Sequence, residues 1–132
     1  MRWPPWRGRP APPTDRRALG VWGEVVAERE LRRRGYAIRD RNVRTPAGQI
    51  DLVAEQDGAI VIVEVKTRHV GAFGGAREAI TGAKAGRLKR LGAGYVQHLS
   101  GAPRSWRVDV VAIDIADQGG YAVDVIVNAV AG

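Results

Sequence analysis

The chain has 132 residues, no cysteine, and 21 Lys and Arg against 14 Asp and Glu, which gives a formal net charge of +7. This length suits one ordinary domain with its own core, and the lack of cysteine excludes a disulfide framework, a Cys-ligated metal site and a thiol nucleophile. No apolar run approaches the ~20 residues of a membrane-spanning helix, and no apolar signal segment follows Met1. We therefore expect a cytoplasmic protein with no membrane partner. The basic excess favours an anionic partner such as nucleic acid.

Positive charge is concentrated in two parts of the chain. Residues 1–14 combine five prolines with three arginines, which is typical of a disordered basic tail, and residues 15–132 then form a single domain. Trp3 and Trp6 could stack on bases, but a tail with no specific role is the simpler interpretation. Residues 65–104 carry eight Lys and Arg against one acidic residue. Such clustering favours a surface that contacts phosphate groups.

Hydrophobic periodicity predicts two helices and five strands in the order α-β-β-β-α-β-β. The expected elements are a helix from Thr14 or Asp15 to Arg34, strands at 36–44, 49–55 and 59–67, a helix from 76 or 81 to 99, and strands at 106–115 and 121–128. The glycine-rich loop at 71–75 lacks the Gly-Lys-Ser/Thr of a P-loop. Because the run from Ile60 to Val63 is apolar throughout, we expect it to be buried on both faces. This order implies an α/β fold, with one mixed central sheet flanked by helices.

Each predicted helix has one apolar side. Gly35 ends the first helix after three arginines, and the apolar side of that helix consists of Ala18, Val21, Trp22, Val25 and Val26. The apolar side of the second helix consists of Leu88, Leu91, Tyr95 and Leu99. Four glycines weaken the second helix, each by up to about 1 kcal/mol relative to alanine, and close packing against the sheet would explain them. They are Gly82, Gly86, Gly92 and Gly94.

Two charged residues interrupt the apolar strand at 59–67. Glu64 and Lys66 are two residues apart, so they project from the same face, roughly 6.5–7 Å apart along the strand. Asp51 lies on the preceding strand, and a turn at 56–58 places it opposite Glu64 or close to it. Directly opposite residues have Cβ atoms ~4.5–5.5 Å apart. Two carboxylates this close repel each other, so the pKa of at least one is expected to rise unless a cation lies between them.

A divalent cation would relieve this repulsion. Mg²⁺ takes oxygen ligands and commonly uses one or two carboxylates together with phosphate oxygens and water, so Asp51 and Glu64 are candidate ligands for Mg²⁺ or Mn²⁺. The metal would activate water and polarise a phosphoryl oxygen, while Lys66 would orient that water or neutralise charge in the transition state. The alternative is a plain salt bridge between Lys66 and one carboxylate, and these three residues alone do not decide between the two.

The first helix offers a further carboxylate. Gly23 allows a neighbour to come close to the backbone, and Glu24 follows it, with Glu28 one turn later. For either glutamate a solvated helix carboxylate is the simpler interpretation.

A longer set of residues, spread over about 16–115, identifies a family resemblance. It comprises Gly20, Gly23-Glu24, Ala27, Gly35-Tyr36, Arg41-Asn42, Arg44-Thr45-Pro46-Ala47-Gly48, Ile50-Asp51-Leu52, Val63-Glu64-Val65-Lys66-Thr67-Arg68, Phe73-Gly74, Ala79, Lys84, Leu88 and Asp109-Val110-Val111. In these positions the chain resembles the YraN-like family of uncharacterised bacterial proteins, within the restriction-endonuclease-like PD-(D/E)XK nuclease superfamily. It is also similar to archaeal Holliday-junction resolvases.

The resemblance implies a restriction-endonuclease-like αβββαβ core with its site where the central strands diverge. It implies a catalytic set of one helix glutamate, one strand aspartate and a Glu-x-Lys motif, which correspond to Glu24, Asp51, Glu64 and Lys66. Glu24 is thereby favoured over Glu28. One departure matters, because the family usually has Gly-Glu-Ile-Asp where this chain has a glutamine, Gln49, two residues before the aspartate. Whether the site remains active with this neutral amide is an open question.

Several basic residues are candidate contacts to nucleic acid. Lys84, Arg87 and Arg90 lie at spacings of three on the second helix, which predicts a ridge that follows phosphates, against the alternative of a solvated face. Arg44 and Arg68 lie within the motifs above and are assigned the same role.

Three other polar residues are given no catalytic role. His69 and His98 are isolated in sequence, so a histidine-based zinc site is not expected, although His69 could touch a phosphate. Asp109 lies among valines in a predicted strand, and we interpret it as structural.

Two main hypotheses follow. The first is a Mg²⁺-dependent DNA endonuclease that hydrolyses phosphodiester bonds, with branched DNA as one expected substrate. The second is a non-catalytic nucleic-acid-binding module of the same fold, with Gln49 as an early loss. A third is an adaptor whose acidic C-terminal strands bind another protein. A homodimer is plausible, since resolvases commonly cut two strands as dimers.

Overall fold

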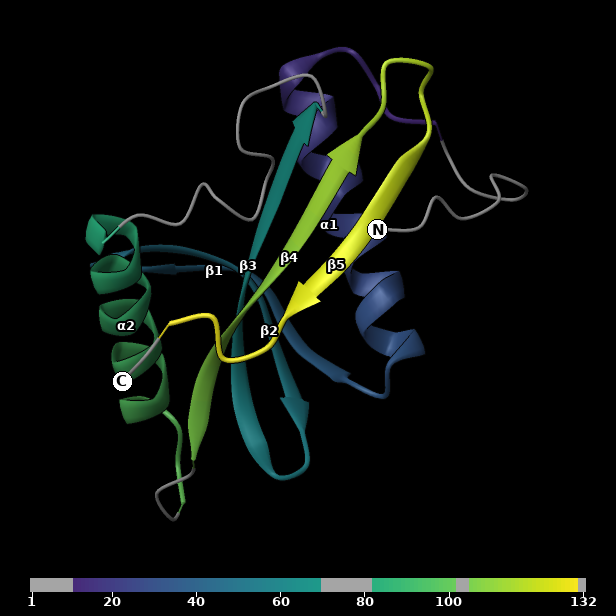
Figure 1. Ribbon diagram of the computed structural model, residues 1–132. Coiled ribbons are helices and arrows are strands. Elements are labelled where there is room, and N and C mark those ends of the chain that lie inside the picture. Colours follow the sequence, from purple (N-terminus) through teal and green to yellow (C-terminus); the bar gives the residue numbers. More distant parts are fainter. Residues whose placement is uncertain (1–10, 70–81, 102–104, 131–132) are drawn as a thin grey trace.

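The computed structural model describes residues 11–69, 82–101 and 105–130. Their helices and strands are α1 (Arg16–Arg33), β1 (Ala37–Thr45), β2 (Gly48–Gln56), β3 (Ala59–His69), α2 (Gly82–Gln97), β4 (Trp106–Ile115) and β5 (Tyr121–Ile126). This order confirms the one predicted from the sequence (Figure 1). Most of the predicted basic tail and the glycine-rich loop at 71–75 lie outside the described residues.

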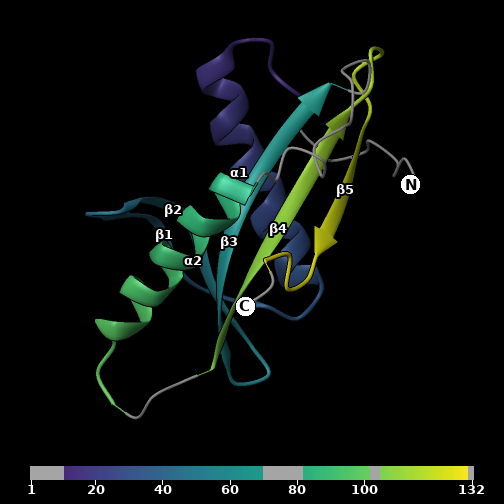
Figure 2. The ribbon, with the colours of Figure 1, turned by 60° about the vertical axis from the view of Figure 1, so that its left-hand side comes forward.

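All five strands form one sheet in the order β1-β2-β3-β4-β5. The pair β3–β4 is parallel, and the other three neighbouring pairs are antiparallel. A parallel pair needs a crossover connection, and α2 lies in the connection between β3 and β4. The two helices cover opposite faces of the sheet (Figure 2). The predicted mixed sheet flanked by helices is therefore confirmed.

The central strand β3 belongs to two hydrophobic cores. Val61 and Val63 pack on the α1 face, whereas Ile60 and Ile62 pack on the α2 face. All four side chains are at most 1% exposed. The prediction that this run is buried on both faces is confirmed, and β3 is thereby held rigidly at the centre of the sheet.

The predicted apolar side of α1 is wrong at three positions. Ala18 is exposed, Val21 and Val25 are 64% and 44% exposed, and the buried side chains of the helix are those of Trp22, Val26, Ala27, Glu30 and Leu31. Gly23 explains this rotation, because a Cβ there would lie 2.8 Å from Cγ2 of Thr67 on β3. The helix therefore turns its glycine to the sheet, and the two valines on the neighbouring side face outward.

Local backbone chemistry sets the ends of several elements. The Asp15 carboxylate accepts a hydrogen bond from Ala18 N at 2.9 Å and caps α1, and Gly35 follows the helix with a φ of +91°. Strand β5 ends at Ile126, two residues before the predicted end. Asn128 has a φ of +52°, and its N–H donates to the carboxylate of Asp109 instead of a neighbouring strand.

The close packing against the sheet that was predicted for the glycines of α2 is found at Gly92 but not at Gly94. The Trp106 ring lies directly against the Cα of Gly92, and an added Cβ would overlap the ring, at 2.7 Å from Cε3. We expect Gly92→Ala to lower the free energy of unfolding by about 1–3 kcal/mol, because Trp106 or α2 must shift. Gly94→Ala, where nothing lies within 4 Å of the added Cβ, is expected to raise it by up to about 1 kcal/mol. Urea unfolding of both variants measures the difference, and equal effects would contradict this packing.

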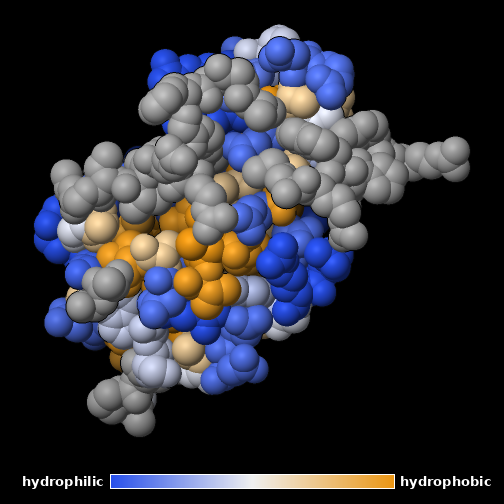
Figure 3. All heavy atoms as spheres, viewed as in Figure 1, coloured by the Kyte–Doolittle hydropathy of each residue, from blue (hydrophilic) through white to orange (hydrophobic). Residues whose placement is uncertain are grey.

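The described surface has one hydrophobic area to note. Figure 3 shows apolar side chains gathered in the middle of the face that carries β5, and Val127, which follows β5, is 55% exposed.

Within the described residues, neither helix combines the length and hydrophobicity needed to cross a membrane. The homodimer stays a prediction.

Candidate functional site

The site lies where β2 and β3 separate. Their pairing ends at Leu52 opposite Val63, whereas β3 continues beside β4 as far as His69. Beyond the last pair, the N–H of Val65 donates a hydrogen bond of 2.8 Å to the carboxylate of Asp51. The aspartate side chain therefore replaces the strand partner that β3 has lost, and this bond fixes the carboxylate in the fork between the strands.

A pocket of about 360 Å³ opens at this fork. It is lined by Gly20, Glu24, Gln49, Asp51, Glu64, Val65, Lys66, Thr67 and Arg87. The structure thus brings together all four residues predicted as catalytic, from α1, β2 and β3. We call this cavity the fork pocket.

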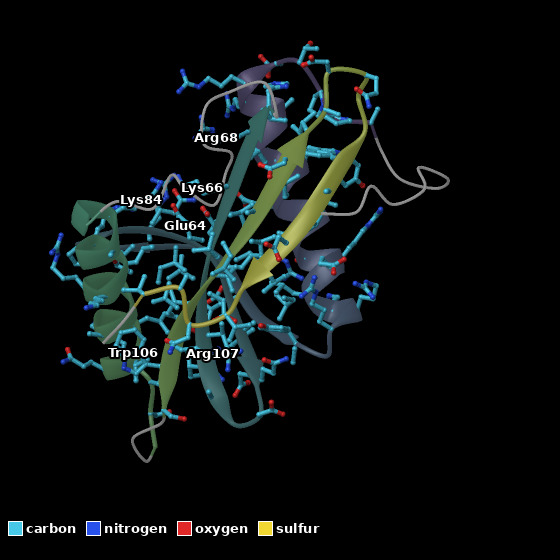
Figure 4. All side chains as sticks on the ribbon, in the orientation of Figure 1. Glu64, Lys66, Arg68, Lys84, Trp106 and Arg107 are labelled. Carbon is cyan, nitrogen blue, oxygen red and sulfur yellow. The ribbon has the colours of Figure 1, made fainter. Side chains whose placement is uncertain are left out.

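Glu64 is the most enclosed acidic group of the pocket, with a side chain that is 7% exposed. Its Oε2 lies 3.1 Å from Nζ of Lys66, which confirms that these two residues share a face of β3. The same oxygen lies 3.6 Å from Nζ of Lys84 and 3.6 Å from Nη2 of Arg87, both on α2. Figure 4 shows Glu64, Lys66 and Lys84 gathered between β3 and the first turns of α2. The salt bridge considered as an alternative is present, but it is part of a larger cluster.

Asp51 carries the largest electrostatic perturbation in the pocket. Its pKa is raised to about 6, mainly by burial; the Val65 N–H lowers it, and the charges of Glu64 and Glu24 also raise it. Lys66 opposes these effects only in part. The predicted rise in the pKa of one carboxylate is therefore confirmed, with desolvation as the main cause.

The pKa values of the two lysines shift in opposite directions, although burial lowers both. Burial would lower the pKa of Lys66, but its contact with Lys84 and the negative charges of Glu64 and Asp51 raise it. Burial lowers the pKa of Lys84, and the neighbouring Lys66 lowers it further, against the pull of Glu64. Lys66 is thus the firmly protonated member of the pair.

Asn42, to which the sequence analysis assigned no role, forms a hydrogen bond with Glu24. Burial raises the pKa of Glu24, and a side-chain hydrogen bond with Asn42 lowers it. Gln49 Nε2 donates to Asn42 Oδ1 at 3.0 Å, so Asn42 joins α1 to β2. Its φ of +50° is rare for a non-glycine residue, and it lies opposite Asp51, since the flanking pairs join Arg41 to Leu52 and Val43 to Ile50. Counting residues along the β1–β2 hairpin places Asn42 opposite Asp51, and this is the sequence signal that could have identified Asn42.

The choice of Glu24 over Glu28 agrees with the geometry. Glu28 accepts hydrogen bonds from Arg41 at 2.7 and 2.8 Å and from Arg32 at 3.0 Å. It therefore ties α1 to β1 on the surface, while Glu24 lines the fork pocket.

The basic residues predicted to contact nucleic acid divide into two groups. Lys84 and Arg87 approach Glu64, as described above. Arg90 is exposed, with its guanidinium 3.5 Å from the position of a Cβ on Gly86, and Arg44 is exposed on β1. Arg68 is partly exposed near the end of β3 (Figure 4). In the first group, Arg87 lines the fork pocket and Lys84 lies beside it, and the second group belongs to its surroundings.

Asp51 and Glu64, the two predicted metal ligands, both line the fork pocket. Within the described part of the chain, no three His, Cys, Asp or Glu side chains are close enough together to hold a metal ion. Mg²⁺ keeps several waters and needs only one or two carboxylates, and Asp51 and Glu64 offer oxygen donors at one fork. The crowded carboxylates that raise the Asp51 pKa would be relieved by a divalent cation.

The remaining polar residues have structural or surface positions. Asp109 is fully buried and accepts a hydrogen bond from the Tyr36 hydroxyl at 2.7 Å, which confirms a structural role. His69 is exposed, and Nδ1 of His98 lies 2.8 Å from the carbonyl oxygen of Gly94.

Taken together, the fold and the pocket define a mixed α/β protein with a carboxylate and lysine site at the fork of its sheet. A family model described as "Uncharacterised protein family UPF0102" matches residues 23–113, and the chain belongs to this family. A UPF0102 protein of Syntrophomonas wolfei is 43% identical over 116 residues, which span 86% of this chain and 97% of the relative. A UPF0102 protein of Roseiflexus castenholzii is 46% identical over 101 residues, which span 76% of this chain and 82% of the relative.

Proposed function

We propose that this protein is a metal-dependent DNA endonuclease that hydrolyses phosphodiester bonds. The observation that carries the proposal is the convergence of Asp51, Glu64 and Lys66 on one pocket, with Glu24 completing it from α1. Buried like charges and perturbed pKa values are costly to maintain, and they are typical of catalytic sites.

Each residue has a distinct role in this proposal. Asp51 and Glu64 hold Mg²⁺ or Mn²⁺, and the bound metal supplies Lewis-acid polarisation of the phosphoryl group. Lys66 remains protonated, so it stabilises the negative charge that develops on the phosphoryl oxygens. Glu24, held by Asn42, faces the same pocket and orients the attacking water.

The order of the elements supports the restriction-endonuclease-like core within this proposal. The chain follows α1-β1-β2-β3-α2-β4, with a parallel β3–β4 pair and the pocket at the fork of β2 and β3. This agrees with an αβββαβ core whose site lies where the central strands diverge.

The test is a cleavage assay with Mg²⁺ or Mn²⁺ on single-stranded, duplex, flap and four-way-junction DNA. We expect the wild type to cut at least one of these and Lys66→Ala to cut it at least about 100-fold more slowly. A circular dichroism melt of the variant controls for folding. Equal cutting by Lys66→Ala would remove Lys66 from the reaction, and no cutting of any DNA by the wild type would overturn the proposed activity.

A non-catalytic DNA-binding module is the second candidate, and Gln49 is the observation that favours it. Its amide lies in the fork pocket, at the position where the YraN-like family that the chain resembles usually has a glutamate. We expect Gln49→Glu to raise Mg²⁺ affinity, because it adds a third carboxylate beside Asp51 and Glu64. The rise in melting temperature on adding Mg²⁺ measures this. If only the Gln49→Glu variant cuts DNA, the wild type is a binding module that lost its activity at this position.

A further inference from the structure

Three cationic groups meet at one oxygen of the fork pocket. Lys66 on β3 and Lys84 and Arg87 on α2 all place a nitrogen within 3.6 Å of Oε2 of Glu64. Since Lys84 and Arg87 are three residues apart, they lie on the same side of α2. The first turn of α2 contains no acidic residue, so no side chain in that turn neutralises the positive end of the helix dipole. One carboxylate therefore faces three positive charges.

Glu64 lies closer to Lys66 than to the other two cations. Charge-assisted hydrogen bonds from Lys or Arg to an anion are ~2.7–2.9 Å long, whereas Lys84 and Arg87 remain 3.6 Å from the carboxylate. Arg87 also lines the fork pocket, and its side chain is 37% exposed. The guanidinium and the two ammonium groups thus surround a position that an oxygen anion already occupies.

A phosphodiester group of DNA has the chemistry that fits this position. It carries one negative charge on two oxygens, and Arg and Lys are its usual partners. We propose that Lys66, Lys84 and Arg87 form a phosphate site for the DNA backbone and that Glu64 occupies this site in the metal-free protein. The inference rests on the proposed function, because it takes DNA as the ligand and a divalent cation as the alternative partner of Glu64.

This arrangement couples metal binding to DNA binding. While Glu64 faces the three cations, a phosphate has to compete with it. When the carboxylate turns to a divalent cation, Lys84 and Arg87 become available to the phosphate, so each ligand favours the other. The protein then binds DNA weakly without metal and avoids holding a backbone that it cannot cut.

The test measures DNA binding without cleavage, by fluorescence anisotropy of a labelled duplex in EDTA at constant salt. We expect Glu64→Gln to bind DNA about 5- to 50-fold more tightly than the wild type, which is the usual range for coupled sites. Glu28→Gln is the matched control. It removes the same charge and releases Arg32 and Arg41 on the surface, and we expect it to change the affinity less than threefold. Equal gains for the two variants would show a general charge effect and overturn the proposal.

Two further measurements keep the proposal testable if Glu64→Gln folds poorly. Ca²⁺, which binds carboxylates, is expected to tighten DNA binding by the wild type about 5-fold or more. In Arg87→Met, which removes one cation of the proposed site, we expect that gain to shrink to less than about twofold. A full Ca²⁺ gain in Arg87→Met would overturn the proposal. If no DNA is ever cut but these binding results hold, the endonuclease proposal fails and the phosphate site stands.

Discussion

Replacing Asp51 by asparagine is expected to abolish DNA cleavage and, at the same time, to stabilise the folded protein at neutral pH. In the proposed mechanism the carboxylate holds a divalent cation, so its loss would remove the metal. The same carboxylate is destabilising in the metal-free fold, because it is largely buried and faces the charges of Glu64 and Glu24. Asparagine keeps an oxygen that can accept the hydrogen bond of Val65 N–H.

The pH dependence of this effect follows from the sign of the pKa shift. The pKa of Asp51 is about 6 in the folded protein, whereas the ordinary pKa of an aspartate in the unfolded chain is 3.8. Between these values the folded state binds more protons than the unfolded state, so this group lowers the free energy of unfolding as pH rises from about 4 to 6. Above pH 6 the full penalty is present, and we expect about 1–3 kcal/mol of it to disappear in Asp51→Asn.

Thermal melts in EDTA at pH 4 and pH 7 measure this difference. Asp51→Asn should melt several degrees above the wild type at pH 7 and close to it at pH 4. Asp40→Asn is a suitable control, because Asp40 is exposed on β1 and its replacement should change stability by no more than about 0.5 kcal/mol. A lower melting temperature for Asp51→Asn at pH 7 would show that the carboxylate stabilises the fold, and it would contradict the expected destabilisation by the buried charge.

The pairing of the central hairpin could be predicted from the sequence because it depends on local features. The turn at Asp57 and Gly58, with φ values of +50° and +81°, sets the register of β2 against β3. Once the turn is known, counting residues brings Asp51 to the level of Glu64, and strand alternation brings Lys66 to the same face. The core of the site therefore follows from short-range rules.

The surroundings of the site could not be predicted in the same way. Rotation of α1 depends on the fit of Gly23 against Thr67, which are distant in sequence. The approach of Lys84 and Arg87 to Glu64 depends on how α2 lies over the sheet, and helical spacing alone cannot distinguish this from a solvated face. Only tertiary packing turns these residues toward the carboxylate.

The largest loss of stability is expected from Arg107→Met, which leaves the buried carboxylate of Asp109 without its cation. Asp109 is fully buried, and Arg107 donates to its two oxygens at 2.9 and 3.1 Å. Arg107 also donates to Gln56 Oε1 at 2.6 Å and so ties β4 to the end of β2. Removing one partner of a buried ion pair lowers the free energy of unfolding by about 3–5 kcal/mol, since the remaining charge stays in the core.

Two companion variants separate the charge from the packing. Tyr36→Phe removes the 2.7 Å hydrogen bond to Asp109 and the 3.3 Å hydrogen bond that the hydroxyl accepts from Arg107, and it should cost about 1–2 kcal/mol. Arg107→Met combined with Asp109→Asn removes the buried charge and should recover part of the loss, whereas no recovery would show that Arg107 acts through packing alone. Figure 4 shows Arg107 near the start of β4, away from Glu64, so each variant that remains folded should bind DNA as the wild type does. Asp51 and Asp109 are thus opposite cases. Removing the Asp51 carboxylate is expected to stabilise the fold, because Asp51 belongs to the site. Removing the cation that pairs with Asp109 is expected to destabilise the fold, because Asp109 belongs to the scaffold.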